Sequence, residues 1–187
     1  LLPVPEKVGT FLGVFADVES ACGAVSAIIG KGIIPAAMEM LDKLTIKAVQ
    51  NVMDSGYPID AGAVLLIEIE GMEEEVEEMS SDVSACIWES GATELKYATD
   101  IIEREALWAG RKGALGAMGS LAPNYFLVDG VVPRTKLTDV LREVQIIAEK
   151  FDIQIANVFH AGDGNLHPCL LFDERIPGAL ENITMAG

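Results

Sequence analysis

The sequence predicts an α+β domain: a ferredoxin-like antiparallel sheet with helices on one face, extended by a second strand-helix-hairpin half. The first observation is the order of periodic segments over residues 1–98, which alternate strand, helix, strand, helix, strand, helix and strand. This is a split βαβ pattern with one extra helix inserted. The second observation is a helix, a strand, a further helix and a hairpin over residues 99–187. We expect the two halves to form one 187-residue domain.

The first half is expected to contain four strands separated by three helices. Asp17 and Asp42 precede apolar residues at helical spacing, and an aspartate side chain can accept hydrogen bonds from the free N–H groups of a first helical turn. The third helix follows Gly71, and its acidic stretch over 73–78 is more typical of a solvated face than of a functional patch. The expected strands span residues 10–15, 35–40, 63–69 and 93–97.

The second half is expected to begin with a helix over 100–117 and a strand over 125–132. An amphipathic helix follows, and then two strands joined by a tight turn; they span 137–151, 155–160 and 166–172. Residues 177–187 carry little apolar pattern, so we expect that segment to be frayed. The opening residues 1–5 are typical of a linker, and we expect the chain to be a piece of a longer protein.

Composition excludes several classes of function. A formal net charge of −16 opposes binding to nucleic acid or to an anionic membrane, and no apolar run is long enough to span a bilayer. Cys22, Cys86 and Cys169 are odd in number and lie among apolar residues, which indicates buried, reduced thiols. We therefore expect a cytoplasmic protein, peripheral to the membrane only through partner subunits.

The segment FHAGDGNLHP at 159–168 contains both histidines of the chain, His160 and His167. Asp-Gly between apolar runs favours a two-residue type I′ turn, which needs φ > 0 at both central residues. With Asp163 and Gly164 in that turn, His160 faces His167 across the hairpin, with Cβ atoms roughly 4.5–5.5 Å apart. Two imidazoles so placed could share a metal ion or hold an anionic substrate. They could equally be two partly exposed histidines without function.

Three further side chains are candidates for the same site. Trp108 and Arg111 share a helix face, where a forked guanidinium suits a carboxylate but also commonly packs over an aromatic ring. Asp129 is either a turn residue or an acceptor that orients a histidine. Asn165 is either a residue that stabilises the turn or a hydrogen-bond donor to a ligand.

Motifs for other chemistries are missing from these residues. The sequence contains no GxGxxG after a strand, no Walker A loop, no HExxH and no GxSxG. A redox cofactor, if one is used, must therefore be bound chiefly by residues outside this sequence.

The chain resembles the C-terminal domain of FAD-linked oxidases, a family that includes glycolate oxidase FAD subunits, D-lactate dehydrogenases and D-2-hydroxyglutarate dehydrogenases. FHAGDGNLHP at 159–168 is the most specific part of the resemblance. Trp-Ala-Gly-Arg at 108–111, Asp-Gly-Val-Val-Pro-Arg at 129–134, the segment 33–39 and Leu-Pro at 2–3 support it. Val-Pro-Arg after Asp-Gly is most similar to the glycolate oxidase type.

The resemblance implies a separate N-terminal domain that binds FAD, with this domain covering the isoalloxazine and providing a pocket for a 2-hydroxy acid. It implies that His160 and His167 are ligands of a divalent metal such as zinc or manganese. It also implies that Arg111 pairs with the substrate carboxylate and that Asn165 lies near the substrate or the flavin. The family's Gly-Glu-His-Gly motif is not in this sequence, and the lysine of some relatives is replaced at 125–127, which weakens a dicarboxylate assignment.

These implications predict the substrate-binding cap of a flavin-dependent oxidoreductase of the glycolate or D-lactate type. The hydroxy acid would be oxidised to the 2-oxo acid by hydride transfer to FAD, with His160 and His167 as catalytic residues. We expect this chain alone to be inactive, and we expect its partners to be the FAD domain of the parent chain and other oxidase subunits. The alternatives are a ferredoxin-like regulatory or metal-binding module without catalysis, and a structural docking domain.

Overall fold

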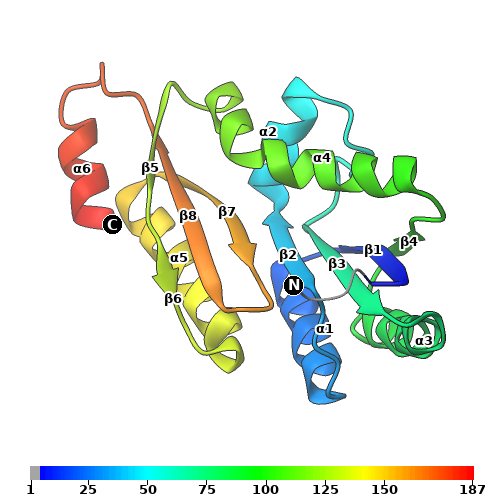
Figure 1. Ribbon diagram of the computed structural model, residues 1–187. Helices are drawn as coiled ribbons and strands as arrows, with labels where there is room; N and C mark the ends of the chain where they lie inside the picture. Colours follow the sequence, from blue (N-terminus) through cyan, green and yellow to red (C-terminus); the bar gives the residue numbers. More distant parts are fainter. Residues whose placement is uncertain (1–4) are drawn as a thin grey trace.

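Apolar residues occupy both faces of the long central strands, so both sides of the sheet must be covered. The computed structural model, which describes residues 5–187, meets this requirement with an eight-stranded sheet between two layers of helices (Figure 1). The strands are β1 (Lys7–Phe15), β2 (Ala37–Asp42), β3 (Ala63–Gly71), β4 (Glu94–Tyr97), β5 (Asn124–Leu127), β6 (Gly130–Val131), β7 (Gln154–His160) and β8 (Asn165–Phe172). The α-helices are α1 (Val18–Gly30), α2 (Lys43–Val52), α3 (Glu73–Glu89), α4 (Ile101–Ala117), α5 (Leu137–Phe151) and α6 (Ala179–Ala186).

The strand order is β4-β1-β3-β2-β7-β8-β5, with β6 also paired to β8, and every pair is antiparallel. The first four strands have the ferredoxin-like order, so the predicted fold class is confirmed. Pairing of β2 with β7 joins the two halves into one continuous sheet. Asp42 strengthens this junction, because one carboxylate oxygen caps α2 at Thr45 and the other accepts from both nitrogens of Asn157.

The sequence predicts helices on one face of the sheet, and this part of the prediction is wrong. Helices cover both faces. One core lies between the sheet and helices α1, α3 and α5, and it includes Phe11, Ile67 and Phe159. The other lies between the sheet and helices α2 and α4, and it includes Leu12, Leu66 and Val158. Successive residues of these strands point to opposite faces of the sheet, and both sets are apolar. The inserted helix α2, together with α4, therefore covers the second face.

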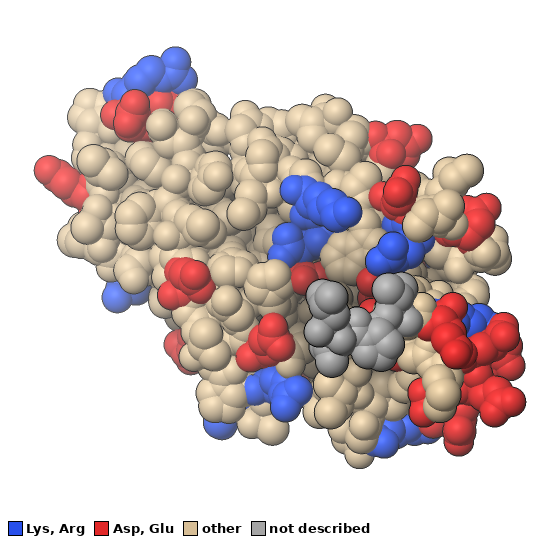
Figure 2. All heavy atoms as spheres, viewed as in Figure 1, with Lys and Arg blue, Asp and Glu red and all other residues tan. Residues whose placement is uncertain are grey.

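The predicted helix starts are confirmed by their caps. The side chains of Asp17, Asp42 and Asp100 each accept a backbone hydrogen bond in the first turn of α1, α2 and α4. The acidic stretch on α3 is largely exposed, and Asp and Glu side chains gather at that end of the molecule (Figure 2). The three cysteines are buried and free, as predicted, and burial raises the pKa of Cys22 and Cys169 to about 11.

Two predictions about the second half are wrong. The strand expected over 125–132 is split into β5 and β6, because its neighbour Pro168 has no N–H to continue the ladder. Residues 177–187 are not frayed: α6 forms there, and Ile183 is buried in a small cluster with Ala148, Ile155 and Leu170. The predicted linker falls mainly on residues 1–4, which lie outside the described residues.

None of the helices in the described part of the chain is long and apolar enough to cross a bilayer.

Candidate functional site

Polar side chains interrupt the apolar face of the sheet that lies under α4. Glu39 on β2 and Glu68 on β3 are both buried there, each 8% exposed. Arg104, Trp108 and Arg111 point toward them from one face of α4. On the outer surface seen in Figure 2, some Lys and Arg side chains lie near the middle of the molecule. The predicted shared orientation of Trp108 and Arg111 is confirmed.

The β7–β8 hairpin has a different turn from the one predicted. His160 pairs with Asn165, and His167 pairs with Val158, so four residues form the loop. The carbonyl of His160 accepts from the N–H groups of both Asp163 and Gly164. Only Gly164 of the two has positive φ, at +74°, which excludes a type I′ turn. The two histidines are therefore diagonal neighbours and not directly opposed.

Only glycine fits at position 164, because any side chain there would collide with the backbone of Val132. A Cβ atom there would lie 2.1 Å from the carbonyl oxygen of Val132, whose N–H donates to the carbonyl of Gly164. Arg134 donates from Nη1 to the carbonyl of Gly162, and the Gly162 N–H donates to the carbonyl of Met38. The hairpin loop is thus held between β2 and the segment that follows β6.

Despite the changed register, both imidazoles lie on the sheet face that carries Glu39. The ring centroids are 5.2 Å apart, with the planes at 86°. Nδ1 of His160 lies 2.7 Å from Oε1 of Glu39, its direct partner across the β2–β7 junction. A carboxylate only accepts hydrogen bonds, so the neutral imidazole of His160 is the tautomer with its proton on Nδ1 and a lone pair on Nε2.

Arg111 is anchored by the same carboxylate. Its Nε and Nη2 each lie 2.9 Å from Oε2 of Glu39, and only 13% of its side chain is exposed. Arg111 therefore forms an ion pair within the protein and does not pack over Trp108, whose indole N–H donates to Glu68. Nη1 of Arg111 remains for another acceptor.

His167 is placed against Asp129. The register of β5 and β6 on β8, continued through their gap, puts these residues opposite each other, and the Nδ1–Oδ1 distance is 3.6 Å. Asp129 therefore faces His167, at a distance longer than a hydrogen bond. Burial lowers the pKa of His167, the charge of Asp129 raises it, and the net direction is downward. At neutral pH His167 is consequently an uncharged acceptor or ligand.

Asn165 on β8 lies opposite His160 on β7, and its Oδ1 is buried with no hydrogen-bond partner in the described part of the chain.

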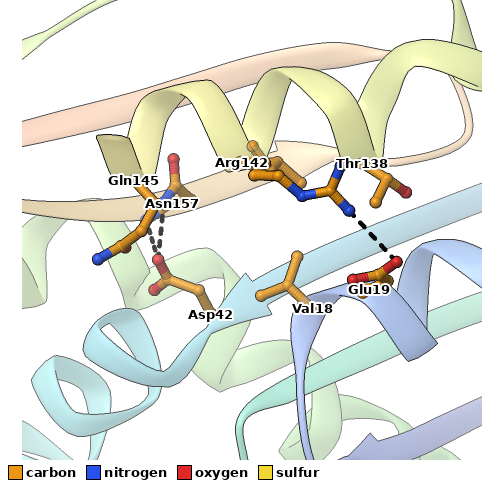
Figure 3. Close-up of a pocket in the computed structure, with 8 residues that line it drawn as sticks. Val18, Glu19, Asp42, Thr138, Arg142, Gln145 and Asn157 are labelled. Carbon is orange, nitrogen blue, oxygen red and sulfur yellow. Dashed lines mark hydrogen bonds and ion pairs between the residues drawn. The ribbon is translucent and has the colours of Figure 1, made fainter. Parts of the chain in front are cut away.

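A hollow of about 150 Å³ opens at this end of the sheet, with Glu39, His160, Arg134 and Asp163 in its wall. A wider cleft of about 290 Å³ lies on the opposite face between α1 and α5, with Asp42 and Asn157 in its floor (Figure 3). It contains none of the predicted site residues.

Comparison with known proteins identifies the family. Residues 4–185 match the family model of the C-terminal domain of FAD linked oxidases. The chain belongs to this family. Similar proteins include the glycolate oxidase subunit GlcD of Escherichia coli strain K12, with 44% identity over 95% of this chain, and that of Bacillus subtilis strain 168, with 37% identity over all of it.

This FAD-linked oxidase domain spans 36% and 40% of the length of those two relatives. A mitochondrial D-lactate dehydrogenase of Arabidopsis thaliana is 27% identical over 85% of the chain, which is 28% of that protein. Among solved structures, p-cresol methylhydroxylase matches 99% of this chain and 42% of its own, with a TM-score of 0.71 and 11% identity. A 4-ethylphenol oxidase from Gulosibacter chungangensis matches 99% of this chain and 43% of its own, with a TM-score of 0.69 and 13% identity, and both support the fold alone.

The predicted residues of this oxidase domain come together only in part. His160, His167 and Asn165 share one sheet face, and Arg111 joins them through Glu39, which sequence reasoning missed. The signal for Glu39 was a lone carboxylate in the apolar strand AMEML, and Glu68 in LLIEIE shows the same pattern. Within residues 5–187, no group of three or more His, Cys, Asp or Glu side chains is arranged to hold a metal ion.

Proposed function

We propose that this domain is the substrate-binding cap of an FAD-dependent 2-hydroxy-acid oxidoreductase of the glycolate or D-lactate type, acting within a longer parent chain. The observation that carries the proposal is the cluster in which Glu39 holds both Arg111 and His160, beside His167. The curated relatives described above, which are named as glycolate oxidase subunits and as a D-lactate dehydrogenase, support the choice of substrate.

The substrate carboxylate would bind to the free edge of Arg111. The guanidinium is always charged and nearly buried, so its attraction for an anion is screened little by water. Asn165 would contribute a polar contact close to His160. A hollow of about 150 Å³ opens beside His160, with Arg134 and not Arg111 in its wall. These contacts would hold C2 and its hydroxyl in one orientation.

Oxidation removes the hydroxyl proton and a hydride from C2 of the hydroxy acid. His160 can accept a hydrogen bond or a proton at Nε2, because Glu39 occupies Nδ1. His167 is uncharged at neutral pH, so it does not repel a cation or a developing positive charge nearby. We propose both histidines as the groups of this domain that contact the reacting hydroxyl.

FAD would supply the two-electron acceptor when bound. This sequence has no glycine-rich dinucleotide loop, so the proposal assigns FAD binding chiefly to another domain of the parent chain. An apolar strip suits contact with that domain or with the flavin ring: Tyr125, Leu127 and Val131 are at least 40% exposed on the face that carries the histidines. The cap would close over the flavin there and exclude water.

The proposal also includes a divalent metal at the two histidines. Nε2 of His160 and Nε2 of His167 are the nitrogens that would hold it, and each Nδ1 faces a carboxylate, as is common for metal-bound histidines. A metal would act as a Lewis acid that lowers the pKa of the substrate hydroxyl. Two nitrogens do not fill a coordination sphere, so we expect zinc or manganese to bind this chain alone weakly or not at all, as isothermal titration would show.

The proposal includes other oxidase subunits as partners, because the relatives are named as subunits. It also includes a cytoplasmic location, in keeping with three buried, free cysteines.

The test is anaerobic reduction of the flavin in the full-length parent protein. Addition of glycolate or D-lactate should bleach the flavin absorbance, while acetate, which lacks the hydroxyl, should not. Absence of bleaching with every short 2-hydroxy acid tried would contradict the proposed function.

A further inference from the structure

We infer that Glu39 is a positioning residue, which sets the tautomer of His160 and the orientation of Arg111 at once. The inference rests on the proposed function for its consequence in catalysis. The geometry itself does not depend on it.

The two carboxylate oxygens of Glu39 serve different partners. Oε1 accepts from Nδ1 of His160 at 2.7 Å, and Oε2 accepts from Nε of Arg111 at 2.9 Å, with Nη2 of the same guanidinium also 2.9 Å from Oε2 as an ion-pair contact. The three residues come from β7, α4 and β2, so one side chain ties together both halves of the domain. No other side chain in residues 5–187 is hydrogen-bonded to both His160 and Arg111.

Burial makes this link stronger than a surface ion pair. Side-chain exposure is 10% for Glu39 and 13% for Arg111, so water replaces neither partner easily. Charge-assisted hydrogen bonds in such surroundings are short and hold their geometry. His160 is more open, with 39% of its side chain exposed.

Each partner gains a defined free group from this arrangement. In the neutral imidazole, a proton held on Nδ1 by Glu39 makes Nε2 the acceptor, as a base or a metal ligand must be. With Nε of Arg111 hydrogen-bonded to Glu39 and Nη2 paired with the same oxygen, the guanidinium is held in place, and Nη1 has no hydrogen-bond partner within residues 5–187. Without Glu39, the imidazole could change tautomer and the guanidinium could turn.

The chain contains a matched control. Glu68 lies on the same sheet face, is equally buried at 8% and also pairs with an arginine of α4. It contacts Arg104, Trp108 and Thr10 and none of the proposed site residues. Glu68→Gln therefore removes a comparable buried charge without touching the site.

The first measurement is nitrogen-15 NMR of the histidine rings in this chain, which has only two histidines. The wild type should show His160 with its proton on Nδ1, Glu68→Gln should show the same, and Glu39→Gln should show a mixture of tautomers. A wild-type His160 with its proton on Nε2 would overturn the inference even if Glu39→Gln failed to fold. So would an unchanged tautomer in folded Glu39→Gln.

The second measurement is turnover in the full-length parent. Glu39→Gln should lower kcat and raise KM for the hydroxy acid, with kcat/KM reduced roughly 10–100-fold, while Glu68→Gln stays near wild type. Equal kcat/KM for the two variants would overturn the inference. A wild-type parent that oxidises no 2-hydroxy acid would instead refute the proposed function, and the NMR result would then decide the role of Glu39.

Discussion

Two buried carboxylates under α4, Glu68 and Glu39, differ in how many hydrogen bonds they accept from other side chains. Glu68 receives a fork of hydrogen bonds from Nε and Nη2 of Arg104, a third from the Trp108 indole and a fourth from Thr10. Glu39 gives one oxygen to His160 and the other to Arg111. Arg104 and Arg111 lie about two helical turns apart, so the same helix face builds both clusters.

The difference separates a structural cluster from a candidate site. All contacts of Glu68 are made within the protein, and its cluster leaves little for a ligand to replace. The Glu39 cluster leaves Nε2 of His160 and Nη1 of Arg111 without a partner in the hydrogen bonds of residues 5–187. Under the proposed function, the Glu68 cluster contributes to stability, whereas the Glu39 cluster holds groups ready to bind the substrate.

The largest expected effect distinguishes the two arginines. Arg111→Lys keeps the charge but loses the planar fork, so kcat/KM of the parent protein for a 2-hydroxy acid should fall roughly 100-fold. Arg104→Lys makes the matching change beside Glu68 and should leave kcat/KM near wild type. Steady-state kinetics measure both. Similar losses in the two variants would show that α4 acts only as a scaffold.

The next effect is on stability. Glu68→Ala removes the acceptor of three side chains, so the free energy of unfolding should fall by about 3 kcal/mol. The exposed pair of Glu19 and Arg142, at 3.4 Å, is the comparison, and Glu19→Gln should change stability little. Urea unfolding followed by circular dichroism measures both. A Glu68→Ala protein as stable as the wild type would contradict the structural role of that cluster.

Acid should weaken the Glu68 cluster. Burial raises the pKa of Glu68, but hydrogen bonds from Arg104 and Trp108 lower it by more than burial raises it. The net pKa therefore lies below the ordinary value of 4.5. A lowered folded-state pKa stabilises the fold above the unfolded pKa and loses that contribution as pH falls through the folded value. The wild type should therefore lose stability below about pH 4.5 more steeply than Glu68→Gln. Parallel unfolding curves across that range would refute this assignment.

The sequence predicts the fold better than it predicts the two carboxylate clusters. The ferredoxin-like order, the caps at Asp17 and Asp42, and the placement of both histidines on one hairpin follow from local patterns. The type of turn could not be predicted from local patterns. Asp-Gly is also compatible with a four-residue loop, in which the hydrogen bonds to His160 involve backbone atoms alone. Local sequence does not distinguish these two loops.

Glu39 shows why the site itself was harder to predict. Its partners are 72 and 121 residues away in sequence, so no short motif joins them. A charged residue within an apolar strand indicates a buried partner but does not name it. The helix α6 was missed for a similar reason, since it packs through Ile183 against residues from α5, β7 and β8.

The smallest expected effect concerns the second histidine. Burial lowers the pKa of His167 below 6.5, while Asp129 raises it, so Asp129→Asn should lower it further. A lowered histidine pKa stabilises the fold above pH 6.5, and that contribution is lost as pH falls toward the folded value. Proton NMR titration of the two imidazoles measures the shift. An increase in the pKa of His167 in Asp129→Asn would contradict the contact.

The central claim is that the open Glu39 cluster, and not the closed Glu68 cluster, receives the acid. A crystal structure of the full-length parent with a bound 2-hydroxy acid tests it most directly. The account predicts the carboxylate within hydrogen-bonding distance of Arg111 and the hydroxyl close to Nε2 of His160. An acid bound away from both residues, with Glu39 still holding them unchanged, would contradict it.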